Sequence, residues 1–157
     1  MIMLRQLLDR LYRTGGIIFP PASADEGGFL RLTLARHKIT MPSAEYFQFL
    51  SLTDGLIFHG LRFYGVHSHK REKANYTFPS LLEVNMNFYD QKRANTFLIV
   101  GETDEDYVTY DFRDKCYHLT DKMDLRSDLV MERFFDILYL LSEDVSKSAQ
   151  MPLRPAP

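Results

Sequence analysis

The part of the sequence that most restricts the fold is residues 96–119, where three short apolar segments follow one another across brief polar connections. Residues 96–101 (TFLIVG) have the composition of a buried strand, residues 107–112 (YVTYDF) alternate with period two, and residues 115–119 (KCYHL) follow after a short turn. Consecutive strands joined by such short turns pair antiparallel. The sequence therefore predicts an antiparallel β-meander in this part of the chain.

Helical patterns surround the meander. Apolar side chains recur at helical spacing in segments that cover residues 4–11, 29–39, 43–50, 81–93 and 129–141. Ser23 and Glu26 have the spacing of a capping box before the second segment, and Ser43 after Pro42 can cap the third. The second segment also shows a strand-like alternation of leucines, but we favour the helix. The fourth helix is expected to end near residues 93–95.

The remaining segments complete the expected order of elements. Residues 61–64 resemble a strand between two glycines, and residues 67–77, which are polar and basic, are expected to form a loop. We predict a single α+β domain over residues 1–142, mainly an antiparallel sheet with a helical N-terminal part, a helix before the C-terminal meander and a closing C-terminal helix. Residues 143–157, which contain three prolines, are expected to be a flexible tail.

Length and charge limit the kinds of partner. A chain of 157 residues holds one hydrophobic core, since a domain of this size buries roughly 70% of its unfolded surface. The formal net charge is −2, with 19 basic and 21 acidic residues and no long block of either sign. Such a chain has no overall field that favours nucleic acid or an anionic membrane. We therefore expect neither of them as a direct partner.

The N-terminus and the cysteine content predict the compartment. Cys116 is the only cysteine and cannot form an internal disulfide, which fits a reducing cytosol. Arg5, Asp9 and Arg10 interrupt the apolar stretch that a signal peptide needs. No segment approaches the ~20 apolar residues of a membrane helix. We expect a cytoplasmic protein.

Three stretches of the sequence resemble one protein family. Residues 41–50 (MPSAEYFQFL) and 53–56 (TDGL) combine an apolar residue and a proline with an aromatic helix and an Asp-Gly turn. Residues 60–65 (GLRFYG) follow as a short strand, and residues 97–112 (FLIVGETDEDYVTYDF) as a hairpin with an acidic loop. In this order and spacing, the sequence resembles the SUKH superfamily, the Smi/Knr-related group of bacterial immunity and interaction proteins, over about residues 20–142.

The resemblance implies a sheet wrapped by helices and, in bacteria, a cytosolic immunity role in which the protein binds and blocks a toxin domain, often a nuclease. Other proteins of this group are interaction modules without a toxin partner. We therefore predict a non-catalytic protein-binding module, specifically an immunity protein that neutralises a toxin domain. Two alternatives stay open: a general interaction or regulatory scaffold, and a metal-assisted hydrolase that uses the acidic loop.

The densest group of acidic residues gives the candidate partner-binding site, which consists of Glu102, Asp104, Glu105, Asp106 and Asp111. Carboxylates held together can bind a divalent cation or act as an acid–base pair, but this spacing is not that of an EF-hand. A solvated hairpin loop is the simpler interpretation. Our hypothesis is that the loop offers negative charge to the cationic groove of a nuclease.

Tyrosines are the second candidate group. Because tyrosine is enriched at interface hot spots, exposed anchors are expected among Tyr46, Tyr64, Tyr76, Tyr107 and Tyr110. We assign Tyr64 and Tyr107, together with the acidic residues, to the partner-binding surface.

The histidines and the cysteine receive a structural interpretation. His59, His67 and His69 lie close in the sequence, and the last two would share one face of a strand, as some metal sites require. No fourth ligand stands nearby in the sequence, so a loop is favoured. Cys116 and His118 would also share a strand face, as a nucleophile and its base would. A cysteine in an apolar-aromatic strand usually behaves as a small core hydrophobe, and we favour that role.

A small basic patch, formed by Lys70, Arg71 and Lys73 and followed by Tyr76 and Phe78, could contact phosphates and stack on bases. A solvated loop is favoured, because the rest of the chain adds no comparable basic surface. The sequence contains no nucleophile elbow, phosphate loop, dinucleotide-binding glycines or HExxH motif. We therefore predict that the protein is not an enzyme and has no catalytic, cofactor-binding or metal-binding residues.

Overall fold

The computed structural model describes residues 2–90 and 97–150 and places five α-helices and nine strands within them. The helices are α1 (Ile2–Arg13), α2 (Ala24–Arg36), α3 (Ala44–Leu50), α4 (Leu81–Asp90) and α5 (Phe134–Gln150). The strands are β1 (Ile17–Ile18), β2 (Leu56–Phe58), β3 (Leu61–Phe63), β4 (His69–Arg71), β5 (Tyr76–Phe78), β6 (Phe97–Glu102), β7 (Asp106–Asp111), β8 (Cys116–Asp121) and β9 (Ser127–Met131). A short 3₁₀ helix, η1 (Glu72–Ala74), joins β4 to β5.

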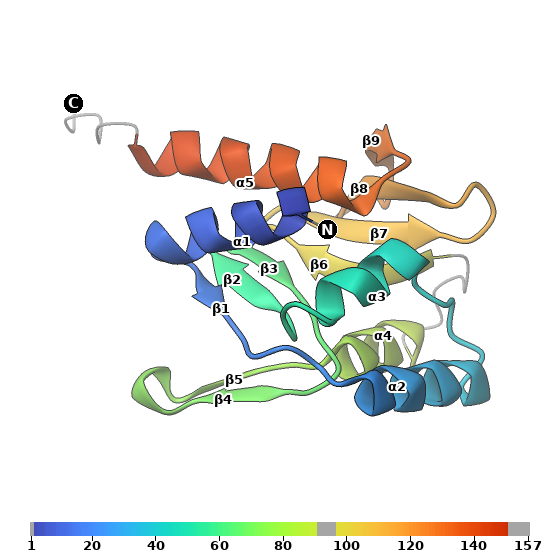
Figure 1. The fold of residues 1–157 in the computed structure, drawn as a ribbon. Helices are drawn as coiled ribbons and strands as arrows, with labels where there is room; N and C mark the ends of the chain where they lie inside the picture. The colour runs from blue at the N-terminus through green and yellow to red at the C-terminus, as the bar shows by residue number, and fades with distance from the viewer. Residues whose placement is uncertain (1, 91–96, 151–157) are drawn as a thin grey trace.

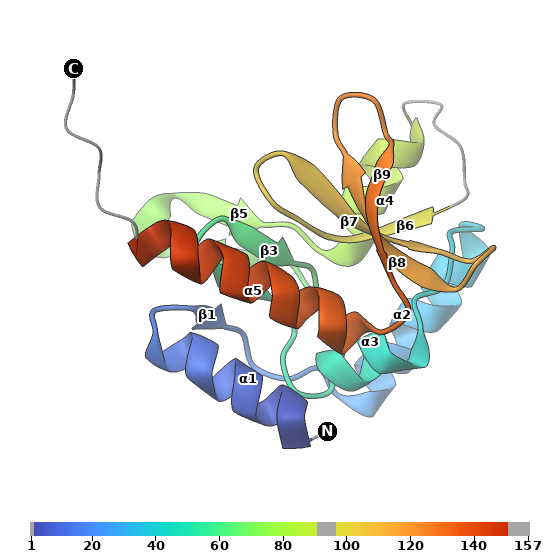
Figure 2. The same cartoon turned by 90° about the horizontal axis from the view of Figure 1, so that it is seen from above.

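Seven of these strands form one antiparallel sheet in the order β1-β2-β3-β6-β7-β8-β9, and β4 and β5 form a separate hairpin. Helices α1, α3 and α5 lie over one face of the sheet, and α4 lies on the opposite side (Figure 1 and Figure 2). This arrangement confirms the predicted α+β class, with its helical N-terminal part, the helix before the meander and the closing helix. No helix of the described residues is long and apolar enough to cross a membrane.

Two helix starts form as the sequence predicts. The Ser23 hydroxyl accepts a hydrogen bond from the Glu26 amide at 3.1 Å, and α2 begins at Ala24. This is one half of the predicted capping box, because the Glu26 carboxylate lies 3.0 Å from His67 instead. Ser43 accepts from the Tyr46 amide at 3.2 Å in the same way at the start of α3. Each bond satisfies an amide that the first helical turn leaves free. The segment of residues 29–39 is therefore helical rather than a strand, although α2 ends at Arg36 and not at residue 39.

The predicted meander is present. Strand β6 pairs with β7, and β7 pairs with β8 in an unbroken register that brings Asp106 opposite Asp121. Strand β2 was not expected as a separate strand. It pairs with β3 through a tight turn at His59 and Gly60, whose φ angles are 46° and 85°.

Residues 67–77 are not the predicted loop, because they form the β4–η1–β5 hairpin. Most of its side chains are exposed or only partly buried. Neither strand therefore shows the alternation of apolar and polar residues that identifies a half-buried strand in a sequence.

The closing helix begins later than predicted. Leu129 and Val130 belong to β9, which pairs with β8, and α5 begins only at Phe134. An apolar run this short is compatible with either type of element. Residues 127–131 form a strand because their backbone pairs with the free edge of β8.

The closing helix also ends later than predicted. It continues to Gln150, so the flexible tail expected from residue 143 is wrong for residues 143–150. The rest of the expected tail, residues 151–157, and the expected end of the fourth helix at residues 93–95 lie outside the described residues.

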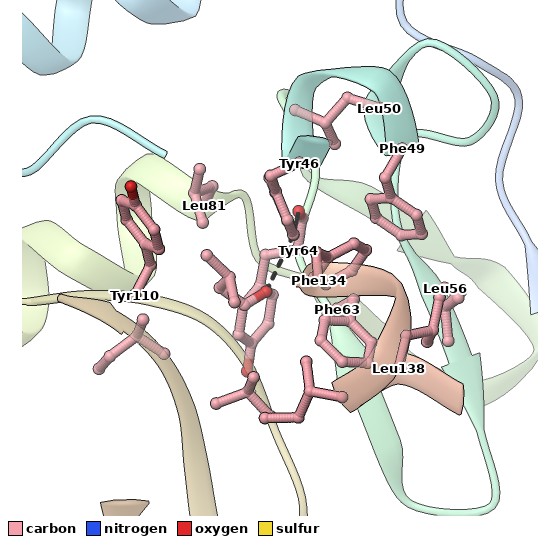
Figure 3. Packing of buried hydrophobic residues seen from close by; sticks show 14 of the residues in the cluster. Tyr46, Phe49, Leu50, Leu56, Phe63, Tyr64, Leu81, Tyr110, Phe134 and Leu138 are labelled. Atoms are coloured by element: carbon pink, nitrogen blue, oxygen red, sulfur yellow. Dashed lines mark hydrogen bonds between the residues drawn. The ribbon is translucent and has the colours of Figure 1, made fainter. Parts of the chain in front are cut away.

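The core is centred on aromatic rings that come from both helices and sheet. Phe134 is fully buried, and its ring centroid lies 4.9 Å from that of Tyr46, 5.0 Å from that of Phe49 and 5.3 Å from that of Phe63 (Figure 3). The buried Tyr46 hydroxyl donates a hydrogen bond to the backbone oxygen of Tyr64. Helices α3 and α5 are thus fixed to the same part of the sheet.

Candidate partner-binding surface

A tight turn between β6 and β7 carries the most exposed side chains of the predicted site. The Thr103 amide donates to the Asp106 backbone oxygen at 2.8 Å, and the Asp106 amide donates to the Thr103 hydroxyl at 3.1 Å. These bonds leave Asp104 and Glu105 at the tip, where the Asp104 side chain is 89% exposed. The turn therefore presents two carboxylates to solvent.

Two further aspartates join Asp106 in a cluster. Asp121 lies directly opposite Asp106 on β8, and Asp128 comes from β9. One carboxylate oxygen of each residue lies within 4.8 Å of those of the other two. We call these three residues the acidic triad, and the triad together with Asp104 and Glu105 the acidic edge.

The charge of the acidic triad is not neutralised inside the described part of the chain, where none of the three residues forms an ion pair. Burial, followed by the negative charges of the other two triad members and of Glu105, raises the pKa of Asp106. The positive charge of Lys122 opposes this rise in the pKa of Asp106, but the Lys122 ammonium group donates a hydrogen bond to the Glu102 carboxylate at 2.5 Å. A cation supplied by a ligand or partner would relieve the repulsion among the three carboxylates.

Glu102 and Tyr64 face the interior rather than a partner. The Tyr64 hydroxyl donates to the Glu102 carboxylate, which also lies 2.5 Å from the Lys122 ammonium and 3.7 Å from the Arg62 guanidinium. Tyr64 is only 1% exposed, and its ring stacks on Phe78 with 5.3 Å between centroids. The prediction that Tyr64 is an exposed anchor is therefore wrong, and the charge of Glu102 is compensated within the protein.

The ion pairs of Glu102 predict a pH-dependent contribution to stability. Burial raises the pKa of Glu102, but hydrogen bonds from Lys122 and Tyr64 and the charge of Arg62 outweigh it, so the pKa is lowered. A lowered folded-state pKa means that this stabilisation is present above the unfolded value of about 4.3 and is lost as the pH falls through the folded value. We expect Glu102→Gln to lower the free energy of unfolding by about 1 kcal/mol at neutral pH, and by less below about pH 4.

Urea unfolding of the wild type and the Glu102→Gln variant over a pH series measures this difference. Glu132→Gln is the matched control, because Glu132 is exposed on the loop before α5, and this change should leave the pH profile unaltered. A difference between Glu102→Gln and the wild type that stays constant from neutral to acidic pH would contradict the assignment.

Asp111 lies at the other end of β7 and is not part of the acidic edge. Its side chain accepts a hydrogen bond from the Arg113 guanidinium at 2.7 Å. That hydrogen bond lowers the pKa of Asp111 and outweighs the opposing effect of burial. Asp111 therefore secures the β7–β8 turn and contributes no free charge to the predicted site.

The remaining candidate tyrosines differ in exposure. Tyr107 is half-buried, with its ring nearly perpendicular to that of Phe88 at 5.9 Å between centroids, so only part of it can reach a partner. Tyr46 and Tyr110 are buried, and their prediction as exposed anchors is wrong. Tyr76 is 43% exposed, on the β4–β5 hairpin.

A hollow borders the acidic edge. It has a volume of about 450 Å³ and is lined by residues 103–106, by His59 and Gly60 of the β2–β3 turn, and by Val145 and Ser148 of α5. A side chain of a partner can enter this hollow and lie next to the carboxylates of the turn.

His67 and His69 converge on the buried carboxylate of Asp54. Its Oδ2 atom lies 2.9 Å from His67 Nδ1 and 3.0 Å from His69 Nε2, and His67 Nε2 lies 3.0 Å from a Glu26 carboxylate oxygen. The His69 ring stacks on Phe19 with 4.0 Å between centroids. The favoured interpretation of the histidines as part of a simple solvated loop is wrong, because carboxylates distant in the sequence reach them. These contacts fix the β4–β5 hairpin to the rest of the fold.

Cys116 and His118 do not contact each other as a nucleophile and its base. The two ring nitrogens of His118 lie 2.7 Å from the Ser127 hydroxyl and 2.7 Å from the Asp114 carboxylate. Burial, followed by the charge of Asp114, raises the pKa of the Cys116 thiol and disfavours the reactive thiolate. Cys116 is half-buried rather than in the core, because Tyr117 occupies the core side of β8.

The basic patch lies on a separate hairpin. Lys70 and Arg71 are on β4, Lys73 is in η1, Tyr76 is exposed on β5, and Phe78 is buried. Among the described residues, this hairpin forms a two-stranded sheet separate from the seven-stranded sheet that carries the acidic edge. The opposite charges therefore sit on different structural units.

Sequence reasoning missed two members of the acidic triad. Asp121 could have been found, since a hairpin that pairs Asp111 with Cys116 brings Asp106 opposite Asp121. Asp128 gave no such signal, because the register between β8 and β9 is irregular and the neighbouring apolar run suggested a helix.

No protein-family model matches the sequence, and no curated protein is significantly similar to it. The likeness to the SUKH superfamily therefore rests on the three stretches of sequence at residues 41–56, 60–65 and 97–112.

Proposed function

We propose that this protein is a non-catalytic protein-binding module whose acidic edge receives a basic surface of its partner. We further propose that it is an immunity protein and that the partner is a bacterial toxin domain such as a nuclease. The immunity role comes from the resemblance to the SUKH superfamily. The acidic edge supports the binding mode.

The observation that carries the proposal is the acidic triad. Its three carboxylates lie within 4.8 Å of one another without an ion pair in the described part of the chain, beside the exposed Asp104 and Glu105. A nuclease needs cationic side chains to hold the phosphates of its substrate. An acidic surface that occupies this groove accelerates association and discriminates against partners of the wrong charge.

The same triad supports a second candidate function. Three carboxylate oxygens this close together suit a hard divalent cation such as Mg²⁺ or Ca²⁺, as the alternative of a metal-assisted hydrolase requires. Calorimetric titration with these cations distinguishes the candidates. Tight binding that Asp121→Asn abolishes, together with turnover that chelation removes, would favour the hydrolase over the binding module.

The proposal predicts a strong effect of charge on association. In a purified complex with the toxin domain, replacing Asp104, Glu105 and Asp106 by their amides is expected to lower the association rate about 10–100-fold at low salt. The difference should shrink as salt screens the charges. Stopped-flow or surface-binding kinetics at several salt concentrations measure both effects.

The matched control is an equal change of charge at a distance. Glu83→Gln with Glu132→Gln and Asp136→Asn removes three exposed carboxylates outside the acidic edge and should change the rate much less. Equal association rates for the wild type and the acidic-edge variant at low salt would refute the steering role.

A further inference from the structure

Strand β9 is an open edge of the seven-stranded sheet. Within residues 2–90 and 97–150 it pairs with β8 alone, and Figure 1 shows it at the margin of the fold. An edge strand presents a row of backbone N–H and C=O groups that no neighbour uses. The opposite edge, β1, has only two residues, whereas β9 has five. The sheet therefore has one edge long enough to accept a further strand.

Neither proline nor lysine protects this edge, although its register with β8 is irregular at Asp128. Its sequence, SDLVM, contains neither lysine nor proline, the residues that commonly block pairing at an edge. Val130 is 53% exposed, and valine is a residue that favours strand pairing. The single charge on the strand is Asp128, a member of the acidic triad.

The charge around β9 determines which strand can pair with it. A second copy of this protein would bring its own triad to the same edge, since paired strands lie only about 4.8 Å apart, and the like charges would repel. A strand that carries lysine or arginine would instead place a cation beside the three carboxylates. The charge thus opposes self-association and favours a basic partner.

We infer that β9 is the docking edge for an extended basic segment of a protein partner, which adds to the sheet as an eighth strand with a lysine or arginine beside Asp106, Asp121 and Asp128. In this mode, main-chain hydrogen bonds supply affinity and side-chain pockets supply specificity. The inference rests on the proposed function, because it describes how the acidic edge binds its protein partner.

A synthetic peptide tests this inference without the toxin. The probe is a blocked peptide of alternating valine and lysine, titrated into the full-length protein and followed by amide NMR. We expect shifts and slowed amide exchange in Ser127–Met131, and about tenfold weaker binding of the matched valine–glutamate peptide.

Variants separate backbone pairing from simple charge attraction. Val130→Pro removes an amide of the edge strand and should weaken peptide binding about tenfold or more, whereas Val130→Thr keeps the amide and should weaken binding much less. If the proline variant does not fold, a lysine peptide methylated at alternate backbone nitrogens removes the same hydrogen bonds from the ligand side. The inference is overturned if the shifts map away from β9, if the two peptides bind equally, or if the methylated peptide binds as tightly as the parent.

The outcomes distinguish this inference from the proposed function. Peptide binding at β9 in a protein that gives no protection against a toxin would retain the docking edge and remove the immunity role. Protection against the toxin in a protein whose β9 binds no basic peptide would retain the immunity role and overturn the docking edge.

Discussion

Phe134→Ala is expected to lower the free energy of unfolding by about 3–5 kcal/mol, enough to leave a marginally stable domain largely unfolded at moderate temperature. The ring is fully buried and meets aromatic rings from α3 and from the sheet, including Tyr46 at 4.9 Å and Phe63 at 5.3 Å. Alanine would leave a cavity where α5, α3 and β3 meet. These elements cannot close it without losing their own contacts.

Phe112→Ala is the matched control for this prediction. Phe112 follows β7 and is 54% exposed, so its truncation should change stability by no more than about 0.5 kcal/mol. Thermal and urea unfolding, followed by circular dichroism, measure both variants. If the Phe134→Ala and Phe112→Ala variants lose similar amounts of free energy of unfolding, the described core is incorrect.

Gly65→Ala is expected to destabilise the protein by at least about 3 kcal/mol although it adds a single methyl group. A Cβ atom at this position would overlap both the backbone oxygen and a side-chain oxygen of Asp54. Those atoms cannot move away easily, because the Asp54 side chain also accepts hydrogen bonds from the Val66 amide at 2.5 Å and from the His67 amide at 3.1 Å. The methyl group would break the cluster that fixes the β4–β5 hairpin.

Gly28→Ala is the control, because it makes the same substitution at a position with room for the added methyl group. A Cβ atom at Gly28 would meet nothing within 4 Å, and the residue lies inside α2, where alanine is the better helix former. We expect this variant to be more stable than the wild type by about 0.5–1 kcal/mol. Unfolding experiments in which both glycine variants behaved alike would contradict the close approach of Asp54 to Gly65.

The sequence was sufficient where local chemistry decides the structure. Ser23 and Ser43 cap their helices as predicted, because the cap and the amide that it accepts are only three residues apart. The β7–β8 hairpin was predictable for the same reason, since its two strands follow each other directly in the chain. The predicted acidic turn also presents Asp104 and Glu105 to solvent.

The sequence was insufficient where distant segments decide the structure. The partners of His67 and His69 are carboxylates from other parts of the chain, and the burial of Tyr64 depends on Phe78 and Glu102. Residues 127–131 form a strand only because β8 offers them an edge. Such choices follow from tertiary packing, which propensity and periodicity do not contain.

The candidate site shows the same division. Of the predicted acidic residues, Asp104, Glu105 and Asp106 lie together at the acidic edge, whereas the charges of Glu102 and Asp111 are compensated by basic neighbours. Asp121 and Asp128 join the edge through strand pairing rather than through nearness in the sequence. The surface proposed to bind a partner is therefore a property of the folded sheet.

The most direct test of the proposed function is to co-express the protein with candidate toxin domains, beginning with any that is encoded beside its gene, and to record both bacterial growth and co-purification. We expect growth to be restored, the two proteins to purify as a stable complex, and the acidic-edge variant to protect less well than the wild type. Continued growth inhibition without a complex, although the protein is folded and abundant, would contradict the immunity role.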